Sequence, residues 1–277
     1  MPTALAMATD LWSRCDIDVG DGIVPVWVAG NGPPLLLLHG WTLDHQMWQP
    51  QIETLGARYR LITPDRRGFG RSTAPPDLTR EAGDVLKIAD ALDLHRFGLA
   101  GLSQGAAVAL EVAIRNPVRV QAVALAGTPL PGLVTDTDTD ADPVRWNEYS
   151  AMVRDGSIAM FRRTWLAHPL MQVGTEAGRM LLARIVANYD GRDLLQPSML
   201  EIFTRDAIAA LPMPLLAIAG SDESGWRIDC AHLLAEAAPH GMFVSIADAG
   251  HIANVAQPAA FDAAMIDFLE AHLSFPA

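Results

Sequence analysis

Ser103 stands in a pentapeptide that is typical of a nucleophilic serine. The sequence GLSQG occupies positions 101–105, between an apolar run that ends at Ala100 and a stretch with helical spacing of apolar residues. In a turn between a strand and a helix, the flanking glycines leave room for a sharp bend and the serine hydroxyl is exposed at the edge of the sheet. The pattern predicts that Ser103 is a nucleophile for acyl transfer; the alternative is a turn serine that caps the helix.

A serine hydroxyl needs a nearby base to become a nucleophile at neutral pH, and His251 is the candidate. The chain has eight histidines, and His251 directly follows the last predicted strand, in the segment AGH at 249–251. The carboxyl ends of parallel strands meet at one edge of a sheet. We therefore expect His251 to lie beside Ser103 and to accept its proton.

A carboxylate is also required, to orient the imidazole and to stabilise its protonated form. The segment GSDE at 220–223 follows another predicted strand at the same edge and offers both Asp222 and Glu223. The chain order of serine, acid and histidine suits a catalytic triad on a parallel sheet. From the residues alone, both carboxylates remain candidates.

Two backbone amides are candidates for binding the oxyanion of a tetrahedral intermediate. The segment HGW at 39–41 ends the predicted strand at 34–38, so the amide of Trp41 lies at the catalytic edge. The amide of Gln104, at the start of the helix after Ser103, is the second candidate donor. A structural turn is the alternative for the HGW segment.

The elements that must position these residues form an alternating pattern. Short apolar runs bounded by Gly, Pro, Asn or Asp alternate with longer stretches of helical period, which predicts a mostly parallel, doubly wound α/β sheet. We predict strands at 23–28, 34–38, 60–63, 97–102, 120–125, 215–219 and 242–247. We predict helices at 80–94, 104–115 and 258–272.

The alternation stops after about residue 128. The following segment has helical patterns at 146–153, 158–167, 176–189 and 199–210, and a polar loop at 135–142. We predict that 1–128 and 212–277 form a core domain and that 129–211 is a helical cap over the catalytic edge. Apolar side chains of this cap are candidates for substrate binding, namely Trp146, Trp165 and Met171. Packing within the cap is the alternative role for them.

Five segments resemble the strand-end signatures of the α/β-hydrolase fold superfamily: LLLLHGW, ITPDRRGFGRS, GLAGLSQG, LLAIAGSDE and ADAGH. The chain looks like a serine esterase or lactonase of this superfamily, with resemblance to its cofactor-free haloperoxidases and enol-lactonases. The resemblance implies that Ser103 is the nucleophile, His251 the base, Trp41 and Gln104 the oxyanion donors, and the inserted segment a lid. It implies no metal and no organic cofactor. Asp65 and Arg66 would be bonded to backbone rather than catalytic.

The resemblance also favours Glu223 as the acid. In similar proteins the acid comes three positions after the glycine that ends the strand, which here is Gly220. Asp222 is the runner-up, because Asp is the commoner residue in this role and a shorter turn would present it. Asp222 and Glu223 therefore both remain candidates for the acid.

The expected function is a serine hydrolase that cleaves a small to medium, mainly apolar carboxylic ester or lactone through an acyl-enzyme intermediate. Alternatives on the same fold are a cofactor-free perhydrolase or haloperoxidase, or a carbon–carbon bond hydrolase. Thr42 stands where the haloperoxidases usually carry Pro, and Ser103 stands where dehalogenases carry Asp. A non-catalytic small-molecule receptor is a further alternative, but such a protein has no need of an oxyanion site.

Composition limits the remaining possibilities. The chain has 277 residues, 50% of them hydrophobic, and a net charge of −12, which favours a globular protein and disfavours nucleic acid and strongly anionic substrates as partners. No apolar run approaches the roughly 20 residues that span a bilayer, and no secretory signal is apparent, so we expect a cytoplasmic protein. The two cysteines, Cys15 and Cys230, have no metal-ligand spacing and are expected as thiols, with a single disulfide as the alternative.

Overall fold

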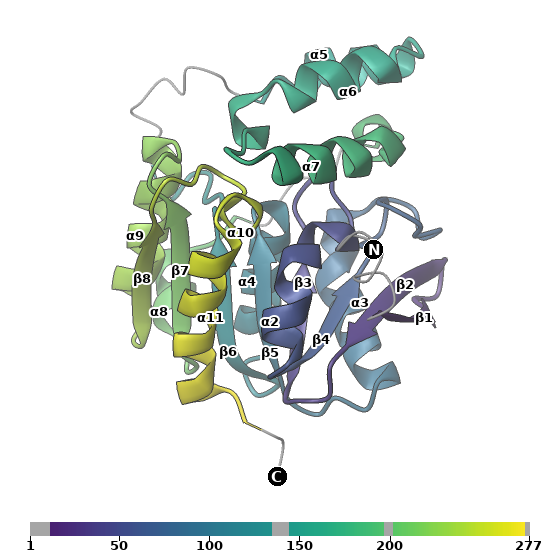
Figure 1. Cartoon of the computed structure of the whole chain (residues 1–277). Coiled ribbons are helices and arrows are strands. Elements are labelled where there is room, and N and C mark those ends of the chain that lie inside the picture. Colours follow the sequence, from purple (N-terminus) through teal and green to yellow (C-terminus); the bar gives the residue numbers. More distant parts are fainter. Residues whose placement is uncertain (1–11, 135–143, 197–201, 275–277) are drawn as a thin grey trace, which may run out of the picture.

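A single eight-stranded sheet forms the centre of the molecule (Figure 1). The structure is a computed structural model and describes residues 12–134, 144–196 and 202–274. The strand order is β1-β2-β4-β3-β5-β6-β7-β8. The first two pairs, β1 with β2 and β2 with β4, are antiparallel, and all the other pairs are parallel. The strands are β1 (Ser13–Asp18), β2 (Ile23–Ala29), β3 (Pro34–Leu38), β4 (Arg60–Pro64), β5 (Phe97–Leu102), β6 (Val120–Ala126), β7 (Leu215–Gly220) and β8 (Gly241–Ile246).

Helices cover both faces of the sheet, so the central strands are apolar at nearly every position. Every residue of β3, β5, β6 and β7 is buried. Leu36 and Leu38 pack in the core on one face, whereas Leu35 and Leu37 pack in the core on the other. The first face carries α3 (Leu78–Ala91), α4 (Gln104–Arg115), α8 (Arg205–Ala209) and α9 (Gly225–Ala237). The second carries η2 (His45–Gln51), α2 (Ile52–Gly56), α10 (Ala253–Ala256) and α11 (Pro258–His272).

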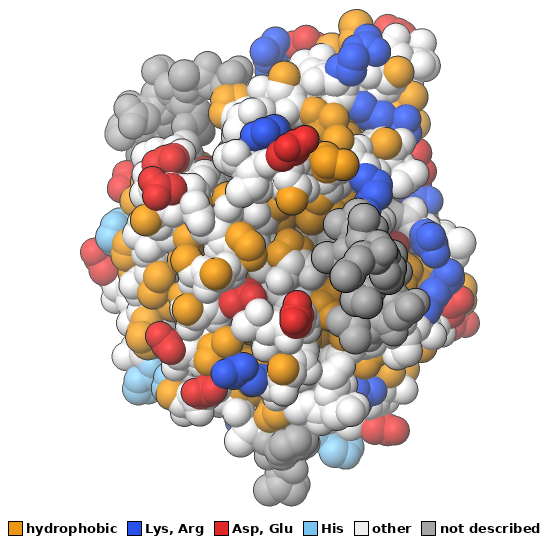
Figure 2. All heavy atoms as spheres, in the orientation of Figure 1, with side chains coloured by type: hydrophobic (Ala, Val, Ile, Leu, Met, Phe, Trp, Pro, Cys, Tyr) orange, Lys and Arg blue, Asp and Glu red, His pale blue; other side chains and the backbone are white. Residues whose placement is uncertain are grey.

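A layer of helices between β6 and β7 lies over the carboxyl ends of the strands (Figure 1). It comprises α5 (Trp146–Arg154), α6 (Ile158–Leu166), η3 (Pro169–Met171), α7 (Glu176–Asn188) and η4 (Arg192–Leu195). We call this layer the cap. In the space-filling view, several arginine side chains gather over the cap at the upper right (Figure 2). The exact division of the chain into a core and a cap at 129 and 211 stays a proposal.

The fold class is as predicted, and the seven predicted strands match the structure to within one or two residues at each end. The structure adds β1, which the sequence pattern did not predict because this edge strand is largely exposed and carries charges between its apolar residues. It also adds η2, α2, α9 and α10. The helix predicted at 199–210 begins at Arg205 and packs beside α9 rather than within the cap; residues 197–201 and the loop predicted at 135–142 lie outside the described residues.

The two cysteines lie at opposite ends of the sheet. Cys15 is on the edge strand β1, and Cys230 is buried in α9, which packs on β7 and β8. Neither cysteine forms a disulfide in the structure. The alternative of a disulfide between Cys15 and Cys230 is therefore excluded in this structure.

Candidate active site

The turn between β5 and α4 holds Ser103 in a strained conformation. Its backbone has φ 55° and ψ −120°, which a residue with a side chain rarely adopts and which costs about 1–3 kcal/mol. The flanking glycines make this turn possible. A Cβ on Gly101 would lie 2.4 Å from the carbonyl oxygen of Gly105, and a Cβ on Gly105 would lie 2.4 Å from that of His39. The neighbouring strand β6 holds the turn in place, since the Ser103 amide donates to the carbonyl oxygen of Ala126 over 2.8 Å.

His251 and Glu223 form a buried pair at the same edge of the sheet. The distance from Nδ1 of His251 to Oε2 of Glu223 is 2.6 Å, and the other oxygen, Oε1, accepts the Ser224 amide at 3.1 Å. Asp222 is exposed, and its Oδ1 accepts the Ser221 hydroxyl at 3.0 Å. The structure therefore pairs Glu223, and not Asp222, with the histidine. This bond directs Nε2 of His251 away from Glu223.

Burial and charge set the protonation of this pair. Burial lowers the pKa of His251 below its ordinary value, and the charge of Arg227 acts in the same direction, while Glu223 opposes both. Burial by itself raises the pKa of Glu223, but His251 and Arg227 outweigh it, so the pKa of Glu223 lies below its ordinary value. At neutral pH the site therefore holds a neutral imidazole against a carboxylate.

The oxyanion candidates lie on neighbouring loops. Trp41 follows β3, Gln104 begins α4, and both line the cavity that contains Ser103. Arg66 connects the two loops: its amide donates to Nε2 of His39 at 3.0 Å, and its Nη2 donates to Oε1 of Gln104 at 2.8 Å. This places the His39–Trp41 turn beside the start of α4. Both ring nitrogens of His39 are engaged by backbone groups, and burial holds the pKa of His39 well below its ordinary value.

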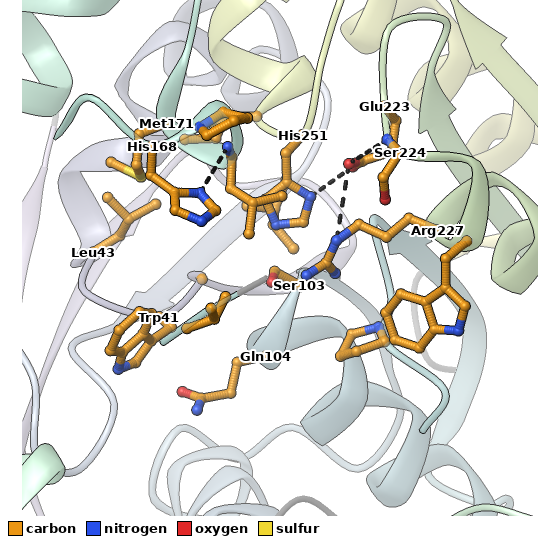
Figure 3. A pocket seen from close by; sticks show the side chains of 18 of the residues that line it. Trp41, Leu43, Ser103, Gln104, His168, Met171, Glu223, Ser224, Arg227 and His251 are labelled. Atoms are coloured by element: carbon orange, nitrogen blue, oxygen red, sulfur yellow. Dashed lines mark hydrogen bonds and ion pairs between the residues drawn. The ribbon is translucent and has the colours of Figure 1, made fainter. Parts of the chain in front are cut away.

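A cavity of about 920 Å³ lies between the catalytic edge and the cap. Ser103, Glu223 and His251 all line this cavity, and Figure 3 shows their side chains close to one another. The predicted substrate-binding residues Trp146, Trp165 and Met171 line it as well. These residues also pack within the cap, which was the alternative role considered for them.

Trp165 shows that lining and packing coexist. It is 3% exposed, and its ring centroid lies 4.7 Å from that of Trp41. Its Nε1 donates to Oγ1 of Thr42 over 2.7 Å. Trp146 is half exposed and also packs against Trp41, with centroids 4.5 Å apart. The wall of the cavity is therefore also the core of the cap.

Several cavity residues were not predicted from the sequence, namely His168, Ser224, Trp226 and Arg227. Arg227 carried one usable signal, because it lies four residues after Glu223, which directly precedes the N-cap of α9, and this spacing allows the two side chains to approach each other. His168 carried none, since its place over the catalytic edge depends on how the cap folds.

Asp44, His45 and Asp65 bring three ligand-type atoms within 4.8 Å of one another, but they satisfy each other and the backbone. Oδ1 of Asp65 accepts both the amide and Nδ1 of His45, and Oδ2 accepts the amide of Arg71. Asp44 accepts the amide and the side chain of Gln46. Asp65 is thus bonded largely to backbone. Arg66 differs from expectation, because its guanidinium contacts the side chains of Glu81 and Gln104.

Comparison with known proteins agrees with this architecture. Residues 33–168 match the family model described as alpha/beta hydrolase fold. The enol-lactonase from Burkholderia xenovorans LB400 superposes with a TM-score of 0.77 at 24% identity, over 92% of this chain and all of that one. The chain has the α/β-hydrolase fold.

Two relatives of this α/β hydrolase cover most of its length. The 3-oxoadipate enol-lactonase 1 of Acinetobacter baylyi is 25% identical, over 83% of this chain and 86% of that protein. RutD of a Caulobacter species, named as a proposed carbamate hydrolase, is also 25% identical, over 87% of this chain and 92% of that protein. These relatives support a hydrolase on the α/β fold. Within the described ranges, every helix is too short or too polar to cross a membrane.

Proposed function

We propose that this α/β hydrolase is a serine hydrolase of small to medium, mainly apolar carboxylic esters or lactones. Ser103 is the nucleophile, His251 the base and Glu223 the acid of its triad. The observation that carries the proposal is the convergence of a strained turn serine and a carboxylate-bonded histidine on one cavity. A binding protein would gain nothing from holding a serine at positive φ.

The reaction follows from the geometry in two half-reactions. The Ser103 hydroxyl makes no hydrogen bond among the described residues, so it can turn toward Nε2 of His251. Oγ attacks the substrate carbonyl carbon while Nε2 takes its proton, and Glu223 stabilises the imidazolium that forms. The amides of Trp41 and Gln104 donate to the oxyanion. His251 then returns the proton to the leaving alcohol, and water hydrolyses the acyl-enzyme by the same steps.

The cavity and the relatives support the substrate class. Most of the lining is apolar, and Trp41, Trp165 and Met171 supply much of it. A volume of about 920 Å³ accepts a small or medium molecule but not a polymer. One relative is named as an enol-lactonase, whose reaction is the opening of an ester within a ring. Esters and lactones require the same acyl chemistry at Ser103.

The first prediction tests this proposal through Ser103→Ala. We expect a rapid burst of nitrophenol from 4-nitrophenyl acetate with the wild type, and a loss of more than about a thousandfold in kcat in the variant, because the nucleophile is gone. Ser13→Ala, at the far edge of the sheet, is the matched control and should keep full activity. A folded Ser103→Ala protein with wild-type turnover would exclude the serine mechanism. Peroxide-dependent bromination or carbon–carbon cleavage without ester turnover would favour the alternative reactions.

A further inference from the structure

Arg227 is a buried cation in the wall of the catalytic cavity. It is 8% exposed and lines the cavity together with Ser103 and His251. Figure 3 shows its guanidinium extending from α9 into the region between Glu223 and Ser103. Among the described residues the only hydrogen bond of the guanidinium runs from Nη1 to the carbonyl oxygen of Gly127, at 3.1 Å. Most of its donors are therefore unused by the protein.

The nearest carboxylate balances the charge of Arg227 but does not satisfy its N–H groups. Nε of Arg227 lies 3.8 Å from Oε1 of Glu223, beyond hydrogen-bond range. The two oxygens of Glu223 already accept from His251 and from the Ser224 amide. Leaving N–H groups of a buried guanidinium without acceptors is unfavourable, and the charge of Glu223 alone does not remove that cost.

A second unpartnered polar group lies beside it. Ser224 is the N-cap of α9, yet its hydroxyl makes no capping bond and is buried without a hydrogen-bond partner in the described part of the chain. Nε of Arg227 is likewise buried without a hydrogen-bond partner among the described residues. Ser224 and Arg227 are three residues apart at the start of one helix, so they share a face, and both line the cavity. The polar patch of Ser224 and Arg227 interrupts an otherwise largely apolar wall.

We propose that Arg227, assisted by Ser224, binds a carboxylate group of the substrate. This inference rests on the proposed function and narrows it to esters or lactones that carry a free carboxylate. A guanidinium binds a carboxylate through two parallel N–H donors, which fixes the orientation of the substrate as well as its affinity. The net charge of −12 does not oppose this, because a buried cation dominates the potential within the cavity.

Carboxylate binding also has a consequence for the base. The charge of Arg227 lowers the pKa of His251, and a bound carboxylate would offset that effect. His251 would then become a stronger base when the anionic substrate is in place. Neutral esters would gain neither the binding nor this effect.

The kinetic test compares two ethyl esters of matched length, monoethyl glutarate and ethyl pentanoate. We expect the wild type to prefer the anionic ester at least tenfold in kcat/KM. Arg227→Gln should lower the ratio of the two values at least tenfold, and Arg227→Lys should retain part of the preference. If Arg227 only supports Glu223, both rates fall together and the ratio is unchanged, which overturns the proposal. Arg163→Gln removes an exposed positive charge from the cap and should leave the ratio unchanged.

A binding test separates this proposal from the proposed function. Glutarate and the neutral pentanamide are titrated calorimetrically into Ser103→Ala protein, with and without Arg227→Gln. We expect glutarate to bind at least tenfold more weakly when Arg227 is replaced, and pentanamide, which carries no carboxylate, to change little. Equal glutarate affinity in both proteins overturns the carboxylate site. Arg227-dependent glutarate binding in a wild type without esterase activity would instead retain the site and reject the hydrolase.

Discussion

Two adjacent carboxylates, Asp222 and Glu223, differ in every property that matters for catalysis. Glu223 is 9% exposed and bonded to Nδ1 of His251, whereas Asp222 is exposed and bonded to the Ser221 hydroxyl. A charge close to the imidazole in a dry site acts strongly, while an exposed charge is screened by solvent. We therefore expect the two residues to differ in function as well.

The second prediction exploits this pair with matched amide substitutions. Glu223→Gln keeps the shape and removes the charge, so the imidazolium formed on attack loses its stabilising partner, and we expect kcat to fall by about 10²–10⁴. Asp222→Asn should change kcat by less than about threefold. Steady-state kinetics on a neutral nitrophenyl ester measure both. The reverse order of effects would assign the role to Asp222.

The third prediction concerns the pH dependence of kcat/KM, which reports the base in the free enzyme. Burial lowers the pKa of His251, so the neutral, active imidazole persists below pH 6.5 and the acid limb of the profile should lie below that value. Glu223 raises this pKa, so Glu223→Gln should move the limb to still lower pH while the maximum rate falls. Profiles between pH 4.5 and 8 measure both effects. An acid limb at or above pH 6.5 would contradict the assignment of His251 as a buried base.

At the scale of elements, the cap and the loop after β3, which carries the proposed oxyanion donor Trp41, form one packed unit. Nε1 of Trp41 donates to Oδ2 of Asp193 at 2.7 Å, and the Tyr189 hydroxyl donates to Oδ1 of the same residue at 2.7 Å. Trp165 bonds to Thr42, which itself has a positive φ of 64°. The bonds of Asp193 and Trp165 run from η4 and α6 to the loop after β3, and the Tyr189 bond joins the end of α7 to η4 within the cap. The position of the Trp41 amide therefore depends on the cap.

The fourth prediction is that Asp193→Ala lowers kcat by about tenfold and changes KM less than that. The substitution leaves the Trp41 indole and the Tyr189 hydroxyl without their acceptor, which costs about 1–3 kcal/mol and loosens the loop after β3 that holds the proposed oxyanion donor. Asp190→Ala is the control, since Asp190 is exposed three residues away. Kinetics together with the thermal midpoint separate the two effects. Loss of stability with an unchanged kcat would show that Asp193 only supports the cap.

At the scale of the whole molecule, several acids are buried outside the catalytic site. Burial raises the pKa values of Asp44, Glu81 and Asp262 to about 6. In the unfolded chain such groups ionise near pH 4. Between these values the folded state binds more protons than the unfolded state, so the stability contributed by these groups falls as the pH rises from about 4 to 6.

The fifth prediction isolates Asp262, on α11. At pH 8 its carboxylate is charged and only 2% exposed, and one of its oxygens, Oδ1, has no hydrogen-bond partner within the described residues. Asp262→Asn should therefore stabilise the protein at pH 8 by about 1–2 kcal/mol, less than the full shift because solvent screens part of the field, and should have little effect at pH 4. Thermal or urea unfolding at the two pH values measures this. Asp267→Asn, exposed on the same helix, is the control; an equal effect of Asp262→Asn at both pH values would contradict the prediction.

The sequence by itself determined the fold class, seven of the eight strands, and the edge at which Ser103, His251 and the acidic turn meet. It could do so because hydrophobic periodicity is local, and because parallel strands bring their carboxyl ends to one edge wherever they lie along the chain. The edge strand β1 was missed because its exposed, charged residues leave little periodic signal.

Only the tertiary structure decided the direction of individual side chains. The amides of Ser221 and Asp222 donate to the carbonyl oxygens of Ile246 and Ala249, and these contacts with a distant segment turn Glu223 inward and Asp222 outward. The entry of Arg227 into the cavity and the attachment of Trp41 to Asp193 depend on the same kind of contact. Such contacts join residues far apart in the chain, so no local pattern records them.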